Sequence, residues 1–138
     1  MTDTSRVRGR PANAVRAAAL LYAANGAGFG IGAALTGWYY AHHRELPMTP
    51  FGFRSLSGPF ESLGSDRFVA LIWALVGLCA LDVLTGAWLW HGRRRGAVAS
   101  VASAPVSLGL GVGFALPLLL ATLPVRLVLV WLGRRSLR

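Results

Sequence analysis

The chain has 138 residues, of which 54% are hydrophobic, with a mean hydropathy of +0.53 and a formal net charge of +9. Only 14% of the residues are charged, and they cluster between long apolar blocks, a composition that excludes a water-soluble globular domain and indicates an integral membrane protein. Most of the positive charge lies in arginine clusters that flank these blocks, so it favours contact with anionic lipid headgroups and does not imply nucleic-acid binding.

The first apolar block, residues 15–40, is long enough to cross a bilayer, for which a helix needs about 20 residues. It follows a basic N-terminal arm, residues 1–14, but its apolar run is too long for a secretory signal, so we expect a retained helix. Alternating glycines make two GxxxG spacings, Gly26/Gly30 and Gly28/Gly32. Such faces allow close helix packing, either within the chain or between copies of it.

A large loop, residues 41–66, follows the first span. Its prolines preclude one long helix, and its aromatic residues alternate with polar ones. This pattern predicts short turns that lie on the outer leaflet or cap the bundle; a lid over an external cavity is the functional alternative.

Two adjacent histidines, His42 and His43, stand at the outer end of the first span. Adjacent helical residues point about 100° apart, so a metal shared by this pair would be strained. The sequence contains no spaced cluster of further ligands, and we predict no metal site. The pair is instead a candidate proton-linked element, because histidine titrates near neutral pH.

The second and third apolar blocks, residues 67–90 and 97–133, complete the membrane domain. The third is too long for one ordinary span, and it gathers helix-disfavouring residues at its middle, namely Gly109, Gly111, Gly113 and Pro117. We predict a tight hairpin there, with short spans over residues 97–113 and 117–133 that either cross fully or form a partly re-entrant hairpin.

Orientation follows from the arginines. The N-terminal arm, Arg93 to Arg95 and the basic tail, residues 134–138, all face the cytoplasm under the positive-inside rule. The sequence therefore predicts an all-α, integral membrane four-helix bundle, residues 15–133, with both termini cytoplasmic and a large first external loop. Every basic residue is Arg and none is Lys, which is typical of a GC-rich bacterial genome and favours a bacterial plasma membrane.

Only one acid, Asp82, lies inside the apolar spans, and Arg126 interrupts the last of them. Counted from the cytoplasmic boundary at about 1.5 Å per residue, both lie roughly 10 to 14 Å deep. Asn25 and Ser103 fall in the same layer. The count predicts a polar cluster with one member from each helix, although it does not fix rotation about each helix axis.

Three interpretations of this cluster stay open. The first is an Asp82–Arg126 pair that fixes helix register, with Asn25 and Ser103 completing its hydrogen bonds. It is favoured because a charge that faces lipid costs about 3 kcal/mol. Arg126 could instead extend to the nearby cytoplasmic interface. The third interpretation is a site that handles protons or a ligand.

In length, span number, large first external loop and short terminal hairpin, the chain resembles the small four-helix bacterial membrane proteins grouped as DoxX-like. The resemblance covers the layout of the whole chain and no residue motif, so it carries over no redox or quinone-linked role.

Three classes of function fit the sequence. The first is a non-enzymatic component that packs with itself or with a larger membrane complex. The second is a small transporter or proton-coupled carrier that uses Asp82 and Arg126. The third is a quinone-linked redox subunit. No spacing of nucleophile and base is visible, so we assign no catalytic residue and no cofactor.

Overall fold

A computed structural model describes residues 13–137 of the chain. Four α-helices dominate it: α1 (Asn13–His43), α2 (Ser65–Trp90), α3 (Arg94–Gly113) and α4 (Pro117–Gly133). Two short 3₁₀ turns, Pro59–Leu63 and Arg134–Ser136, complete this part of the chain, which contains no β-strand. Most of the predicted basic arm, and Arg138, lie outside the described residues.

All four helices are long and apolar enough to cross a membrane, as the hydropathy pattern predicts. The observed bounds differ slightly from the predicted spans. α1 extends to His43, and α3 begins at Arg94, three residues before the predicted start of its apolar span. The third apolar block is therefore two separate helices of 20 and 17 residues.

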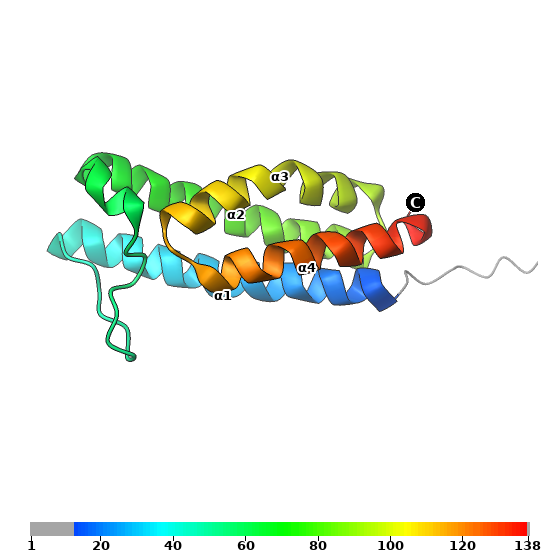
Figure 1. Cartoon of the computed structure of the whole chain (residues 1–138), viewed down its shortest axis with the longest axis horizontal. Helices are drawn as coiled ribbons and strands as arrows, with labels where there is room; N and C mark the ends of the chain where they lie inside the picture. Colours follow the sequence, from blue (N-terminus) through cyan, green and yellow to red (C-terminus); the bar gives the residue numbers. More distant parts are fainter. Residues whose placement is uncertain (1–12, 138) are drawn as a thin grey trace, which may run out of the picture.

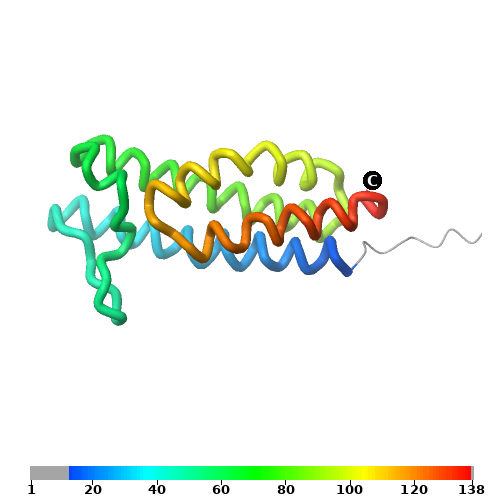
Figure 2. The backbone as a smooth tube through the Cα atoms, viewed as in Figure 1, coloured from blue at the N-terminus to red at the C-terminus, as the bar shows by residue number. Residues whose placement is uncertain are grey.

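The helices form a ring in chain order (Figure 1). α1 packs against α2 and α4, and α3 packs against the same two helices, so α2 and α4 lie diagonally opposite each other. The first and last described residues lie at the same end of the bundle, which we call the terminal end (Figure 2). The end that carries the loop between α1 and α2 is called the loop end.

The α3–α4 hairpin is shorter than its neighbours. At about 1.5 Å per residue, α1 with 31 residues is roughly 46 Å long, whereas α4 with 17 residues is roughly 26 Å long. The hairpin turn therefore stops short of the loop end (Figure 1). The observed turn is Phe114–Leu116, just after the predicted glycines, since Gly109 and Gly111 stay within α3.

Part of the large loop covers this turn. The ring of Phe60 meets the ring of Phe114 edge to face, with centroids 5.2 Å apart, and Thr36 of α1 hydrogen-bonds to Ser55 at 3.0 Å. Leu56 is buried in the same cluster. The other part, around Phe51 and Phe53, projects away from the bundle and is exposed. The loop is thus a cap over the hairpin together with a projecting arm.

The two predicted glycine faces of α1 point in different directions. A Cβ on Gly26 would lie 2.6 Å from the Cys79 carbonyl oxygen, and a Cβ on Gly30 would lie 3.0 Å from the Cys79 Cβ. Gly26 and Gly30 therefore let α1 and α2 approach closely. Gly28 and Gly32 have nothing within 4 Å of a Cβ position and face outward.

Candidate functional site

Asp82 faces the centre of the bundle because it belongs to the buried stripe of α2. That stripe recurs every three or four residues, as expected for one helix face. It consists of Phe68, Ile72, Leu75, Leu78, Cys79, Asp82, Thr85, Gly86 and Leu89. Asp82 is 1% exposed, so its carboxylate needs a partner inside the protein.

Arg126 of α4 supplies that partner. Its Nη1 donates a hydrogen bond to Asp82 Oδ2 at 2.8 Å, and Arg126 is itself only 1% exposed. The pair joins α2 and α4 across the diagonal of the helix ring, and the long side chain of Arg126 makes this contact possible. Arg126 therefore points inward in this structure and does not extend to the terminal end.

The guanidinium of Arg126 also lies over an aromatic ring of α1. Its Cζ is 4.3 Å from the ring centroid of Tyr22, which is 2% exposed. A cation over a desolvated ring gains about 2 kcal/mol. The Tyr22 hydroxyl in turn lies near Ser100 of α3, whose Oγ donates to the Gly96 carbonyl at 3.0 Å. All four helices thus meet around the guanidinium, through Tyr22, Asp82, Ser100 and Arg126.

The structure does not bring Asn25 and Ser103 to the pair. Asn25 Nδ2 donates to Thr122 Oγ1 of α4 at 2.7 Å, which ties α1 to α4 near the ion pair. Ser103 Oγ donates to the Ser100 carbonyl at 3.4 Å within α3. Tyr22 contacts the pair, and Ser100 lies near the Tyr22 hydroxyl. Each stands three positions, about one turn, before the predicted residue of its helix.

Three polar atoms around the pair have no hydrogen-bond partner among residues 13–137: Asp82 Oδ1, Thr85 Oγ1 and Arg126 Nε. Thr85 is 0% exposed and follows Asp82 by three positions, so the two side chains share the inner face of α2. Unpaired buried polar groups are uncommon in folded proteins and call for a reason. Here they mark the pair as the most polar point of the bundle core.

The adjacent histidines lie at the loop end, away from this cluster. His42 Nδ1 donates to the Trp38 carbonyl at 2.8 Å, and His43 Nδ1 donates to the Tyr39 carbonyl at 3.1 Å. Each ring also packs on the aromatic residue four positions before it. Both are exposed, and the described residues contain no group of three or more metal-ligating side chains.

Tyr22 is the site residue that sequence reasoning missed, and a signal for it exists. Tyrosine in a spanning helix is normally found at the membrane interface. Tyr22 instead stands nine positions into α1, well away from the other tyrosines of that helix, Tyr39 and Tyr40. A tyrosine at that depth indicates a polar partner for its hydroxyl or a cation for its ring.

Comparison with protein-family models, with curated proteins and with solved structures finds no match to this chain. The resemblance to DoxX-like proteins is thus one of layout, and the site is interpreted from its own geometry.

Proposed function

We propose that the chain is a non-enzymatic, multi-pass protein of the bacterial plasma membrane that packs with itself or with a larger membrane complex. In this proposal the Asp82–Arg126 pair is a structural clamp and not a reaction centre. The observation that carries the proposal is the burial of both charges, each 1% exposed, across the diagonal of the helix ring. A substrate arriving from water or lipid would have to separate the helices to reach them.

Energetics favour the clamp. Removing one partner of a buried ion pair typically costs 3–5 kcal/mol, because the other charge is left without compensation. A pair that joins the two diagonal helices also restricts their rotation and depth, since an arrangement that separates the two side chains leaves both charges buried without a partner. The clamp thus gives four mostly apolar helices, which could pack in many ways, a single arrangement.

The orientation in this proposal places the terminal end in the cytoplasm. Arg93, Arg94, Arg95, Arg134 and Arg135 border the turns and helix termini at this end, whereas Glu45, Glu61 and Asp66 lie at or near the loop end. Cytoplasmic loops carry the excess of arginine. With Cys79 replaced by Ser, we expect Ser62→Cys to react with an impermeant reagent added outside intact cells and Arg135→Cys to react only after lysis. The reverse pattern would overturn the orientation.

Self-association in this proposal uses the outer face of α1. Gly28 and Gly32 leave a smooth outward strip on this helix, flanked by Ile31 and Leu35, which are each 64% exposed. Small residues at this spacing let a second helix approach closely in lipid. Substitutions at Gly26 and at Gly28 therefore separate the inner strip of α1 from the outer one.

A double-mutant cycle tests the clamp. We expect Asp82→Asn and Arg126→Gln each to lower the free energy of unfolding by about 3–5 kcal/mol, and the double variant to recover at least half of that loss. Unfolding in an SDS titration is followed by labelling of Cys79, the only cysteine of the chain and a buried one. Wild-type stability in both single variants would contradict the clamp.

The exposed ion pair between Arg54 and Glu61, at 3.3 Å, is the matched control. Its side chains are 65% and 44% exposed, so we expect Arg54→Gln to cost less than about 1 kcal/mol.

A second candidate function, proton or small-ligand handling at the pair, is favoured by the three unpaired polar atoms of Asp82, Thr85 and Arg126. It requires that Asp82→Asn fold normally and lose a transport signal, such as a pH change inside proteoliposomes. The structural clamp instead requires that Asp82→Asn be strongly destabilised, so this one variant distinguishes the two functions.

A further inference from the structure

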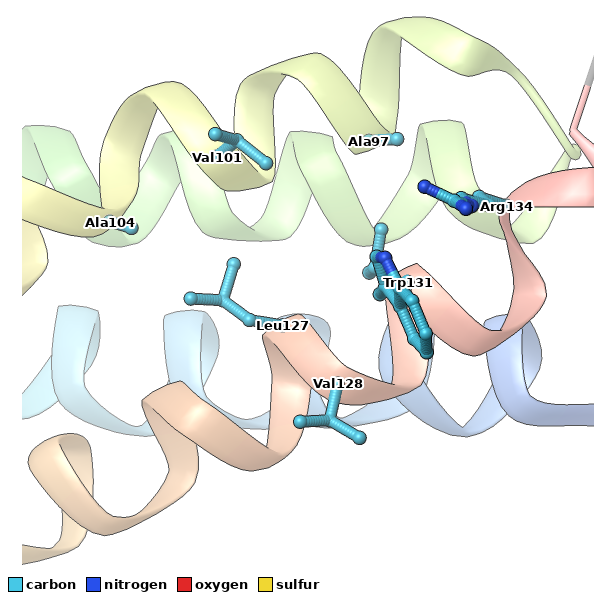
Figure 3. A pocket seen from close by; sticks show the side chains of 8 residues that line it. Ala97, Val101, Ala104, Leu127, Val128, Trp131 and Arg134 are labelled. Carbon is cyan, nitrogen blue, oxygen red and sulfur yellow. The ribbon is translucent and has the colours of Figure 1, made fainter.

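An apolar groove lies between α3 and α4 in the half of the bundle nearest the terminal end (Figure 3). Its volume is about 520 Å³, within the range of ligand sites, roughly 300–1,000 Å³. The side chains that line it are Ala97, Val101, Ala104, Leu127, Val128, Val130, Trp131 and Arg134.

The groove exists because α3 has only small side chains along this stretch. Between Gly96 and Ser107 no residue is larger than valine, so α3 cannot fill the space in front of Leu127 and Trp131. The walls open to the outside of the bundle, since Val101 is 65% exposed and Val128 is 54% exposed. Both helices are candidate membrane spans, so the medium at this opening is lipid.

One end of the groove is positively charged. Arg134 lies there, with its Cζ 5.0 Å from the ring centroid of Trp131, and Figure 3 shows its side chain directed toward the start of α3. Neither of the two ion pairs in residues 13–137 uses Arg134, so no carboxylate within this part of the chain neutralises it. Arg94 and Arg95, in the first turn of α3, add to the positive charge at this end.

We propose that this groove binds one anionic phospholipid, with an acyl chain along Val101 and Val128 and the phosphate at Arg134. From Ala97 to Ala104 the groove is about 10 Å long, about two-thirds of the hydrocarbon depth of one leaflet, which is about 15 Å. Basic pockets between spanning helices on the cytoplasmic side bind anionic headgroups. Trp131 occupies the interfacial position that tryptophan prefers.

Charge complementarity favours a lipid over a second copy of the chain. A parallel second copy would bring its own arginine cluster against Arg134, and like charges repel. A phospholipid instead brings an apolar tail to an apolar wall and a negative charge to the arginines at the end of the groove. The proposal goes beyond the clamp and requires only that α3 and α4 lie in the membrane.

Native mass spectrometry of the full-length protein in mild detergent tests the headgroup part. We add phosphatidylglycerol or phosphatidylcholine with identical acyl chains. We expect phosphatidylglycerol to be retained at least about fivefold more tightly than phosphatidylcholine. We expect Arg134→Gln to lower the retention of phosphatidylglycerol about fivefold. Arg135→Gln removes the same charge from the neighbouring position and should change retention less than about twofold. Equal retention of both lipids, or equal effects of the two arginine substitutions, would overturn the proposal.

A substitution that fills the groove tests the acyl-chain part. We expect Ala104→Leu to weaken retention of phosphatidylglycerol, whereas Ala102→Leu, which enlarges the other side of α3 facing α2, should not. If Ala104→Leu lowers folded yield, Val128→Trp fills the same groove from α4. A groove variant that leaves lipid retention unchanged but alters the oligomeric state would show that protein fills the groove and would overturn the lipid assignment. If the two lipids are retained equally while Asp82 and Arg126 still show coupling in the double-mutant cycle, the lipid proposal fails and the clamp is unaffected.

Discussion

The two halves of the bundle are held together in different ways. α1 and α2 meet along a glycine seam where backbones nearly touch, as at Gly26 and at Gly86, whose Cβ would lie 2.7 Å from the Ala19 carbonyl oxygen. α3 and α4 have an open groove of about 520 Å³ between them. The second half is attached to the first through the Asp82–Arg126 pair, the loop cap and buried apolar side chains such as Leu119 and Val130.

The contrast shows two ways to join helices in lipid, where apolar surface alone gives little preference for one partner. The glycine seam uses van der Waals contact over a long face. The hairpin adds polar and aromatic contacts, the ion pair and the loop cap, to its apolar packing. We infer that the first half is most sensitive to added volume along its seam and the second half to loss of its polar and aromatic contacts.

Enlarging a side chain in the seam should have an effect close to that of breaking the ion pair, and larger than the changes that follow. We expect Gly26→Leu to cost about 3 kcal/mol, because a backbone carbonyl stands where the side chain would go and cannot move aside. Gly28→Leu makes the same change on the outward face and should alter stability by less than about 0.5 kcal/mol. Stability is measured by SDS titration with Cys79 labelling.

The same glycine pair tests self-association. Chemical crosslinking in native membranes should show that Gly28→Leu reduces dimer yield while the fold is retained. A Gly26→Leu protein with wild-type stability would show that the seam is not closely packed. An unchanged dimer yield in Gly28→Leu would remove the outer strip from the proposed function.

Replacing the ring beneath Arg126 should have an intermediate effect. Tyr22→Leu removes the cation–π contact between α1 and the clamp, and we expect a loss of about 2 kcal/mol. Tyr22→Phe keeps the ring and loses only the hydroxyl that approaches Ser100, so it should cost about 1 kcal/mol. Thermal unfolding of the two variants provides the comparison. Equal losses would mean that the hydroxyl, and not the ring, is what matters.

Opening the loop cap should have the smallest effect on stability. Phe60→Ala removes the edge-to-face contact with Phe114 and should cost about 1 kcal/mol. Hydrogen exchange should rise locally at Phe114–Leu116. Phe51→Ala, at an 81% exposed position of the projecting arm, should change neither quantity. Faster exchange across all of α3 would mean that the cap holds the whole hairpin and not just its turn.

The sequence predicts the helix count well, because hydropathy and span length decide it. It also places Asp82 and Arg126 at a common depth, since both are counted from nearby span ends. The rotation of each helix about its axis is harder to predict from sequence. The inner and outer faces of a membrane helix are both apolar, so the periodicity of the sequence hardly distinguishes them. Tyr22 and Ser100 were missed for this reason, as Asn25 and Ser103 stand one turn away at similar depth.

The sequence predicts that the loop lies on the outer leaflet or caps the bundle, but the place of the cap could not be predicted because it depends on a difference in length between helices. Phe60 can contact Phe114 because the α3–α4 hairpin ends before α1 and α2 do (Figure 1). Helix ends read from hydropathy shift by a few residues, which is enough to hide such a step.

The diagonal clamp has a consequence for biosynthesis. Asp82 and Arg126 are 44 residues apart in the chain, so the acid is synthesised before its partner exists. At about 5–20 residues per second, roughly 2–9 s pass between the synthesis of the two residues. During that interval the first two helices are held by their seam alone, and an acid stands without its base. The seam is thus the part of the protein that must form correctly first, and the arginine that arrives last secures it.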